Sequence, residues 1–521
     1  MLQNRFQKSI IWLIAVSTFF RLILAAFIEL GNDEVYYWTY ALYPDWSHFD
    51  HPPMVGIFIQ IFSLNLLIDD EVFIRLSSVV FAAINTWLFF QLGKQIKNEL
   101  SGWYAALLYT ASIYTSLIAG VFILPDTPQV FFWLAGIYLM IDLLPDKDLV
   151  PSSKRKMLLL GLVIGLGILS KYTSVYLWLG AGLYILFFNR LWLKTYQVYL
   201  SVLISVLLLF PVLFWNIQND FISFTFQGER ANIFNSDIRF DLLGTEIGGQ
   251  FIYNNPFVFI LVWIAVFKAF FKNNFIERQK LALLLFLSLP LLITFLFLAL
   301  FRQTLPHWTG PAYLSLMLIG AVYLASKKKE TIHWAIKTAL VFFVALLVLG
   351  FAEINFGLLN SKKITQKDLT LDMYGWKQLS EKIESLFEFD KAEGEMPEDA
   401  PIISWRWFPA AHLDYYIAQS NQKNVLSIGS LERIHKYAWI NRQRGDFKLG
   451  MDAYFITFSN DFEDPTKNIA QYFQFIQAPD TIFIERGGKI VKETYVFRLR
   501  NMINIPQNEL DVKKIINNEN I

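Results

Sequence analysis

Residues Glu29–Gln60 read ELGNDEVYYWTYALYPDWSHFDHPPMVGIFIQ and directly follow an apolar run, Ser9–Ile28. The quoted stretch holds five carboxylates, two of the six histidines and many Tyr and Trp rings, but neither Lys nor Arg. An apolar run of about 20 residues is long enough to cross a bilayer. We therefore interpret Glu29–Gln60 as a loop beside a membrane, where acids and aromatic rings gather for chemistry on a polar substrate.

The composition predicts a protein with many membrane helices. Of its 521 residues, 55% are hydrophobic and only 17% are charged, which is typical of polytopic membrane proteins. The net charge of +1 gives no indication of nucleic-acid binding, because the basic residues are spread over short loops. The lack of cysteine excludes disulfides, thiolate metal sites and a cysteine nucleophile. Ser9–Ile28 has no small-residue cleavage site, so we expect it to remain as a helix.

Apolar segments of membrane-spanning length recur through the first part of the chain. They indicate about eleven membrane helices, and at most thirteen. The predicted spans are 9–28, 72–93, 102–119, 127–144, 157–170, 172–189, 197–215, 251–271, 281–301, 311–326 and 333–352.

The distribution of cations predicts the orientation of these spans. Alternate loops are rich in Lys and Arg, whereas the opposite loops hold only Lys171, Arg230, Arg239 and Arg302. Cation-rich loops face the cytoplasm, so the first loop, residues 29–70, faces outward. We expect a membrane domain over 1–353 and an extracytoplasmic domain over 354–521, in an integral protein of the cytoplasmic (inner) membrane.

The segment 354–521 has the mixed composition of a soluble α/β domain. Short β-rich runs predict strands at 402–405, 424–427, 453–458, 481–485 and 493–499. Helical periodicity predicts helices at 374–387, 410–418, 431–440 and 466–475.

Asp33 and Glu34 are the first candidate catalytic residues. They precede an aromatic run in which Tyr37 and Trp38 lie one helical turn further on, on the same faces. Carboxylates beside aromatic rings suit sugar binding, and a carboxylate at a membrane surface is easily tuned as a general base. The alternative is that Asn32 or Asp33 only caps a short helix.

The loop ends in Asp50-His51-Pro52-Pro53, before a short apolar stretch at 54–67. The prolines first extend and then turn the chain, and the stretch is short enough to lie in the membrane interface. Asp50 and His51 are therefore candidates for binding the sugar or the acceptor. The alternative is that the prolines only separate two interfacial helices.

Further polar residues stand at the outward ends of spans. Lys171 interrupts an apolar run, where a charge is costly and an anionic partner is expected. If Lys171, Arg302 and Arg230 converge, they form a cationic pocket suited to a lipid phosphate. Asp126 and His307 are candidates for sugar or acceptor binding, although Asp126 is also a plausible N-cap. For each cation the alternative is snorkelling to the interface, which suits Arg21 and Arg75 best.

Together these residues resemble the GT-C class of membrane glycosyltransferases, in the branch of protein O-mannosyltransferases and lipid A aminoarabinose transferases. The resemblance covers about residues 1–352. It rests on the Asp33–Glu34 pair, on Phe49-Asp50-His51-Pro52-Pro53, on Leu124-Pro125-Asp126-Thr127-Pro128 and on Leu305-Pro306-His307-Trp308. It implies a polyprenyl-phosphate-linked sugar donor, inversion at the anomeric carbon, and the first-loop aspartate, Asp33, as the base.

Two departures leave the sugar open. Aminoarabinose transferases have Asp-Glu-x-Arg-Tyr, where this chain has Tyr36 in place of the arginine, and Glu-Lys-Pro, where this chain has Asp50-His51-Pro52. Two cations associated with the donor phosphate are therefore missing from the loop. His51 would replace one only if a neighbour such as Asp50 raised its pKa.

We predict an inverting glycosyltransferase that acts on an envelope glycolipid or glycan, with protein O-glycosylation as the alternative. The rival from another class is a transporter or flippase for lipid-linked glycans, which would show mid-membrane charges and inverted repeats. Expected partners are the lipid-linked donor, the acceptor and membrane lipids, and no nucleic acid. No cofactor is certain; a divalent metal ion at Glu34, His51 and Asp126 is a hypothesis. Asp69-Asp70-Glu71 fits helix-start acids better than a metal site.

Overall fold

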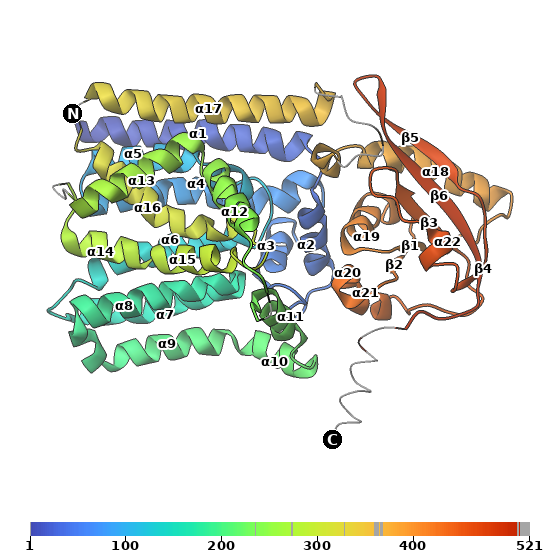
Figure 1. Cartoon of the computed structure of the whole chain (residues 1–521), viewed down its shortest axis with the longest axis horizontal. Coiled ribbons are helices and arrows are strands. Elements are labelled where there is room, and N and C mark those ends of the chain that lie inside the picture. The colour runs from blue at the N-terminus through green and yellow to red at the C-terminus, as the bar shows by residue number, and fades with distance from the viewer. Residues whose placement is uncertain are drawn as a thin grey trace. The chain divides into compact units, whose positions relative to one another are not determined.

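The computed structural model describes residues 2–234, 236–271, 275–327, 329–358, 364, 368–507 and 510 (Figure 1). Its internal contacts divide the chain into two units. The membrane unit comprises Met1–Ala25 and Pro44–Leu347, and the C-terminal unit comprises Ala26–Tyr43 and Val348–Ile521. The segment Ala26–Tyr43, which lies wholly inside the membrane domain predicted from the sequence, thus packs within the C-terminal unit.

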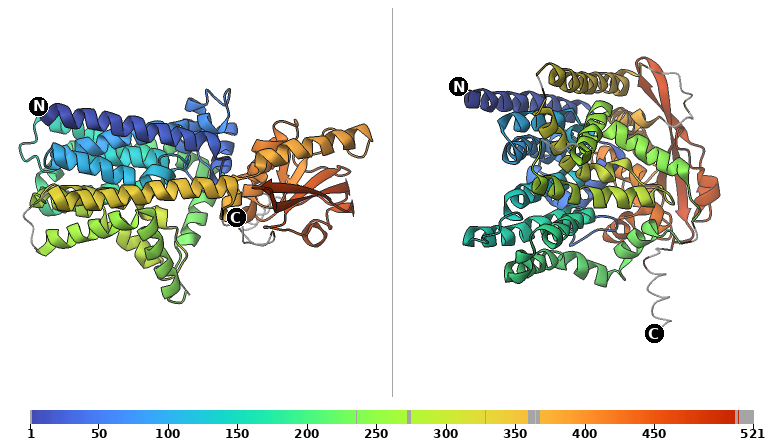
Figure 2. Two further views of the ribbon diagram at one scale, coloured as in Figure 1. Left: turned by 90° about the horizontal axis from the view of Figure 1, so that it is seen from above. Right: turned by 60° about the vertical axis from the view of Figure 1, so that its left-hand side comes forward.

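Every predicted span overlaps one helix or two consecutive helices. The long helices of the membrane unit run along a common direction (Figures 1 and 2). The helices are α1 (Leu2–Phe27), α3 (Met54–Phe62), α4 (Glu71–Ile96), α5 (Glu99–Ala111), α6 (Asp126–Leu143), α7 (Pro151–Ser170), α8 (Tyr176–Phe188), α9 (Tyr196–Leu208), α10 (Phe210–Gln218), α11 (Ile222–Ala231), α12 (Phe240–Tyr253), α13 (Pro256–Phe271), α14 (Arg278–Phe286), α15 (Leu289–Leu298), α16 (Gly310–Leu324) and α17 (Lys329–Phe356).

Four helical stretches among the described residues are long and apolar enough to cross a membrane, and six if two bent pairs each count as one span. The pair α12 and α13 bends by 102°. At this break Asn255 has φ 64°, and Pro256 supplies no N–H to continue the helix. The Asn255 amide donates to the carbonyls of Ala111 and Ala339, at 2.9 and 2.8 Å, and so fixes the bend to two other helices.

The core of the membrane unit forms where helices approach closely. A Cβ atom on Gly93 of α4 would lie 2.6 Å from the Ser101 carbonyl oxygen of α5, so only glycine fits there. The same holds for Gly161 of α7 against Ser201 of α9. Around these contacts lies one continuous apolar cluster that includes Trp133, Tyr184 and Leu314. Small residues at helix crossings therefore set the packing, as in other membrane bundles.

Arg21 and Arg75 do not snorkel, so that prediction is wrong. Their side chains are 4% and 0% exposed. Arg21 donates to the Ser116 hydroxyl at 3.1 Å. Arg75 donates to the Ala25 carbonyl at 3.1 Å, near the end of α1, where a cation complements the helix dipole. Acceptors inside the bundle hold both guanidinium groups, which a hydropathy pattern does not reveal.

The predicted acidic helix start at Asp69-Asp70-Glu71 is confirmed. Asp70 is the N-cap of α4, and its carboxylate accepts the Phe73 N–H at 3.1 Å.

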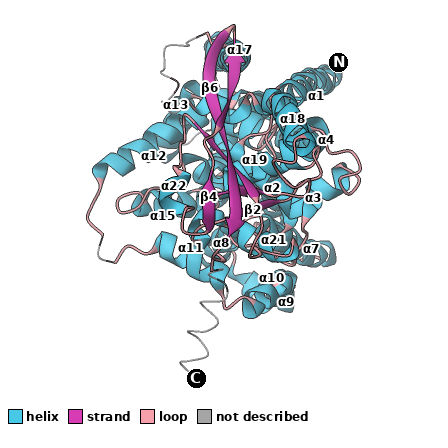
Figure 3. Cartoon of the chain, turned by 90° about the vertical axis from the view of Figure 1, so that its right-hand side faces the viewer, coloured by secondary structure: helices cyan, strands magenta, loops and turns pink. Residues whose placement is uncertain are grey.

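The C-terminal unit is built on a six-stranded mixed sheet, whose strands are magenta in Figure 3. The strand order is β2-β1-β3-β6-β4, and β5 also pairs with β6. The strands are β1 (Ile402–Ser404), β2 (Val425–Ser427), β3 (Ala453–Phe458), β4 (Phe473–Ile476), β5 (Asp480–Arg486) and β6 (Lys489–Met502). β2, β1 and β3 are parallel, whereas β6 runs antiparallel to β3, β4 and β5.

Helices of this unit connect and cover the strands. They are α2 (Asn32–Leu42), α18 (Trp376–Ala392), α19 (Trp407–Leu413), α20 (Leu431–Ile434), α21 (Tyr437–Gln443) and α22 (Pro465–Asn468). Apolar side chains such as Ile403, Phe455 and Leu499 form the sheet's core. The helix predicted over 466–475 is wrong: α22 ends at Asn468 and β4 begins at Phe473. Pairing of Phe473 with Met502 overrides the local helical pattern.

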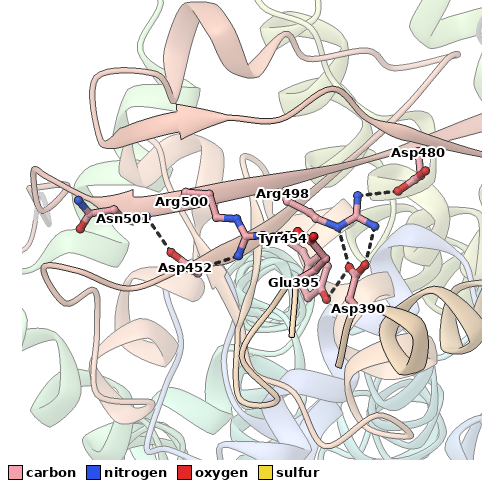
Figure 4. A network of polar contacts seen from close by, with 8 residues as sticks. All are labelled: Asp390, Glu395, Asp452, Tyr454, Asp480, Arg498, Arg500 and Asn501. Atoms are coloured by element: carbon pink, nitrogen blue, oxygen red, sulfur yellow. Dashed lines mark hydrogen bonds and ion pairs between the residues drawn. The ribbon is translucent and has the colours of Figure 1, made fainter. Parts of the chain in front are cut away.

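An ionic network ties β6 to its surroundings (Figure 4). Arg498 donates to both oxygens of the fully buried Asp390, at 2.7 and 2.6 Å. Tyr454 donates to the same carboxylate at 2.9 Å. Arg500 forms ion pairs of 3.0 Å with Asp452 and with Glu395. Paired, hydrogen-bonded charges of this kind are compatible with burial.

Candidate functional site

Helix α2 carries the two candidate catalytic carboxylates, and the structure separates their roles. Gly31 is the N-cap, with an extended backbone (φ −78°, ψ 170°). Glu34 is buried, and its Oε2 accepts the Gly31 N–H at 2.9 Å, as the acid of a capping box does. Asp33 is exposed. The capping role that the sequence left between Asn32 and Asp33 thus falls to Glu34.

Tyr37 and Trp38, the candidate sugar-stacking residues, are 5% and 2% exposed. Trp38 packs edge-on against Tyr415, with ring centroids 5.2 Å apart, and Tyr37 packs against Tyr36 and Tyr40. Both rings are therefore packed inside the C-terminal unit, and a role for them in sugar binding stays a prediction.

A buried ion pair joins two of the candidates in the membrane unit. Lys171 Nζ donates to Asp126 Oδ2 at 2.7 Å, and the two side chains are 7% and 2% exposed. Tyr114 donates its hydroxyl proton to Asp126 Oδ1 at 3.0 Å. The expectation that Lys171 has an anionic partner is therefore confirmed. Sequence reasoning missed Tyr114, which lies in an apolar run.

Local backbone breaks place this ion pair. Asp126 is the first residue of α6, directly after Pro125. Lys171 is extended (φ −156°, ψ 131°) between α7 and the following 3₁₀ turn, Tyr172–Val175. Both side chains thus emerge from helix ends. Irregular backbone at such breaks is tolerated in a membrane protein only where its polar groups find partners within the protein.

Outer segments of the membrane unit hold the loop that bears Asp50 and His51. Ser223 of α11 donates to the carbonyls of His48 and Phe49, at 2.9 and 2.7 Å. Gln227, one turn later, donates to the Asp50 carbonyl at 2.7 Å. The spacing of four residues places Ser223 and Gln227 on one face of α11. This spacing alone does not indicate which loop the two side chains bind.

A second contact fixes the start of the same loop. The Trp215 indole N–H donates to Asp45 Oδ2 at 2.7 Å. Asp45 is one of the five acids of the quoted stretch, so this carboxylate has a structural partner.

Asp50, Asp126, Lys171 and Arg230 are the charged groups that act on His51. Burial lowers the pKa of His51 to about 4 and outweighs the attraction of Asp50 and Asp126. The pKa of His307 is also lowered to about 4, again chiefly by burial. Both imidazoles are thus neutral at pH 7, whereas Lys171 and Arg230 act on His51 as cations. We refer to Tyr114, Asp126, Lys171, His51 and His307 as the Asp126 cluster.

Arg230 and Arg302 have different contact partners, and the convergence of Lys171, Arg230 and Arg302 stays a prediction. The Arg230 guanidinium lies over the rings of Phe226 and Trp308, 5.1 and 5.3 Å from their centroids. Arg302 is exposed and donates to the Asn232 carbonyl at 2.8 Å. Arg230 acts on His51 and lies over Trp308 beside His307. Arg302 follows α15 and contacts the outer loop that precedes α12.

The segment that leads to His307 is held by a buried carboxylate that sequence reasoning missed. Glu246 of α12 is 1% exposed and accepts the Thr304 hydroxyl at 2.7 Å. It also accepts an amide proton of Gln250 at 2.8 Å, and Gln250 in turn accepts from the Tyr313 hydroxyl. The spacing of four residues between Glu246 and Gln250 could have indicated this hydrogen bond, because such residues are neighbours on one helix face.

Within the described ranges, no group of three or more His, Asp and Glu side chains is arranged to hold a metal ion. Glu34, moreover, lies in the C-terminal unit, whereas His51 and Asp126 lie in the membrane unit. The proposed metal ligands therefore receive no support as a set.

The fold defines the class. The chain has the GT-C fold of membrane glycosyltransferases, because it is similar over 94% of its length to ArnT from Cupriavidus metallidurans in the apo state. The likeness covers 98% of ArnT, with a TM-score of 0.63 and 12% identity. The structure of ArnT bound to undecaprenyl phosphate gives a TM-score of 0.62 at 14% identity, with the same coverage. The predicted fold class is confirmed.

Sequence comparison identifies particular relatives. The family described as dolichyl-phosphate-mannose-protein mannosyltransferase matches residues 50–215. The chain is also 22% identical over 318 residues to the lipid A galacturonosyltransferase RgtD of Rhizobium johnstonii. That match covers 59% of this chain and 64% of RgtD, slightly less than two thirds of the relative. The resemblance to this branch of GT-C proteins is confirmed.

Proposed function

We propose that this chain is an inverting glycosyltransferase that moves a sugar from a polyprenyl-phosphate donor to an envelope glycolipid or glycan. The similarity to the lipid A galacturonosyltransferase RgtD is the observation that carries the reaction type and the acceptor class. That a solved ArnT structure holds undecaprenyl phosphate supports a donor on a polyprenyl phosphate. We further propose that the protein lies in the cytoplasmic membrane with its active site and C-terminal unit outside.

In the proposed reaction, the acceptor hydroxyl oxygen attacks the anomeric carbon of the donor. The bond from that carbon to the phosphate oxygen breaks, and its electron pair stays on the departing phosphate. Asp33 accepts the hydroxyl proton as general base. Its exposure supports this assignment, because the neighbouring Glu34 carboxylate is already used to cap α2.

Lys171 and Arg230 are the proposed phosphate-binding residues. Lys171 has three N–H donors, of which Asp126 takes one, so it has capacity for a phosphate oxygen as well. The Arg230 guanidinium lies over the rings of Phe226 and Trp308, and its planar set of N–H donors matches the geometry of a phosphate. Fixed positive charge at the leaving group stabilises the transition state without an accompanying metal. We propose that Asp50, His51, His307 and Asp126 orient the sugar or acceptor.

The family match at residues 50–215 supports a second candidate, transfer of the sugar to a protein hydroxyl. The two candidates share donor chemistry and differ in acceptor. Mass spectrometry of envelope glycolipids and exported glycoproteins from a deletion strain separates them. Loss of one sugar mass from a glycolipid supports the first candidate; intact glycolipids with under-glycosylated proteins support the second. A transporter or flippase of lipid-linked glycans would instead yield no transfer by purified protein.

A further inference from the structure

The segment Ala26–Tyr43, which includes the proposed base, packs within the C-terminal unit, and polar contacts tie it there at both ends. At the N-terminal end, Asn32 bridges two residues of the domain. Its amide donates to Asp372 Oδ2 at 3.0 Å, and its Oδ1 lies 2.9 Å from His412 Nε2. Because the Asn32 oxygen is an acceptor only, His412 donates from Nε2. Asn32 immediately precedes Asp33.

The His412 ring is itself fixed. It is fully buried and stacks on Trp376 with centroids 4.0 Å apart and planes 4° from parallel. Burial holds its pKa well below the usual range, so it stays the neutral single donor that the contact to Asn32 requires.

Two residues before Gly31, Glu29 caps a helix of the domain. Its carboxylate accepts the backbone N–H groups of Trp376 and Lys377, at 2.8 and 3.0 Å. These are the first residues of α18, whose own N-cap residue, Gly375, has no side chain to offer. An acid at a helix N-terminus is favoured by the helix dipole. The Leu30 N–H also donates to the Tyr416 hydroxyl, at 2.6 Å.

At the other end of α2, Lys436 serves as a cationic cap. Its ammonium donates to the carbonyls of Thr39 and Tyr43, at 3.0 and 2.6 Å, and its side chain is 5% exposed. The free carbonyls of a helix C-terminus attract a cation. Arg444 adds a 2.8 Å hydrogen bond to the Tyr43 hydroxyl.

We propose that the C-terminal domain positions the catalytic base, with His412 and Lys436 as positioning residues that act on Asp33 through α2. This proposal rests on the proposed function of Asp33. Asp33 adjoins one of the two clamps, and eight consecutive residues of α2 after it are buried, so the domain determines where its carboxylate lies and how it points.

The test compares His412→Phe and Lys436→Met with a matched control in the full-length protein. His412→Phe keeps an aromatic ring to stack on Trp376 and removes only the N–H donor. Arg500→Met is the control, because it breaks two ion pairs in the same domain, within the network of Figure 4. The hydrogen bonds and ion pairs drawn there join residues of the network to one another and none to Ala26–Tyr43.

Both positioning variants are expected to lower kcat by roughly 10- to 100-fold, since small displacements of a catalytic group carry penalties of this size. KM for the lipid donor should stay within about twofold, because only the chemical step is affected. Hydrogen exchange of the amides of residues 32–43 should accelerate in both variants and not in Arg500→Met. His412→Asn, which restores an N–H donor, should recover part of kcat.

A double-mutant comparison separates positioning from general destabilisation. If His412 acts through Asp33, adding His412→Phe to Asp33→Asn lowers the residual rate no further. A further drop equal to that in the wild-type background overturns the proposal, as does equal loss of kcat in Arg500→Met. If the wild-type protein transfers no sugar, the proposed function fails; the exchange rates of residues 32–43 still report whether the domain holds α2.

Discussion

Lys171 Nζ lies 2.7 Å from Asp126 Oδ2, and both side chains are almost completely buried. The partners are 45 residues apart in sequence and come from the ends of different helices. Removing one partner of a buried ion pair leaves the other charge without compensation, whereas removing both is far less harmful.

We therefore expect Lys171→Met to destabilise the protein by about 3–5 kcal/mol. Combining it with Asp126→Asn should recover most of this loss, because Tyr114 can still donate to the amide carbonyl oxygen that replaces the carboxylate. Thermal unfolding of the purified variants in detergent measures the difference. A double variant as unstable as Lys171→Met would show that the ion pair is not what the lysine contributes.

Arg230 provides a cleaner test of phosphate binding, since it is exposed and its partners are aromatic faces. Arg230→Gln should leave the melting temperature nearly unchanged. It should weaken apparent donor binding by roughly 1.5–3 kcal/mol, the size of a charge-assisted hydrogen bond. Steady-state kinetics with varied lipid donor and fixed acceptor measure the effect.

Arg302→Gln is the matched control, because Arg302 is also an exposed arginine and donates to the Asn232 carbonyl. Its donor KM should stay close to that of the wild type. Equal increases in the two variants would mean that general surface charge, rather than Arg230 itself, attracts the donor.

We expect the free energy of unfolding to depend on pH because of the buried side chain of Lys492. It is 2% exposed between the rings of Trp376 and Phe458. Burial is the main cause that lowers its pKa to about 8. The carboxylates of Glu29 and Asp372 raise this pKa, and the positive charge of Arg486 lowers it further. Below pH 8 the folded and unfolded chains both hold the proton. Between about pH 8 and pH 10.5 the unfolded chain binds more protons, so stability rises with pH by a total on the order of 3 kcal/mol.

The comparison for Lys492 is with Lys492→Met, which has no proton to release. The difference in melting temperature between Lys492→Met and wild type should be largest at pH 7 and shrink toward pH 10. A constant difference over this range would show that the lysine is not charged and buried in the folded protein.

The prediction that the C-terminal unit lies outside can be tested at the two ends of helix α17. Its apolar part, Trp334–Phe356, is 23 residues long, enough for one crossing. A reporter fused after Ser326 should be cytoplasmic, and one fused after Leu358 should be outside. Two reporters on the same side, or the reverse arrangement, would contradict the proposed orientation.

The sequence predicted the positions of the membrane unit's helices because hydropathy is local, and it predicted a partner for Lys171 because a charge in an apolar run needs one. It could not identify Tyr114 as a further partner, since a tyrosine in an apolar run has no distinguishing pattern. It could not predict the packing of Trp38 against Tyr415 either, because the two residues lie almost 380 positions apart. Contacts over such separations follow from the tertiary fold alone.

The most direct measurement is sugar transfer by purified protein supplied with a polyprenyl-phosphate-linked sugar and an envelope glycolipid, for wild type, Asp33→Asn and Glu34→Gln. The wild type should transfer the sugar, and Asp33→Asn should be folded and lose all but a small residual rate, because a neutral amide cannot accept the proton. Glu34→Gln should retain most activity, since the glutamine carbonyl can still accept the Gly31 N–H. A folded Asp33→Asn protein whose rate falls by only about threefold would contradict Asp33 as the general base.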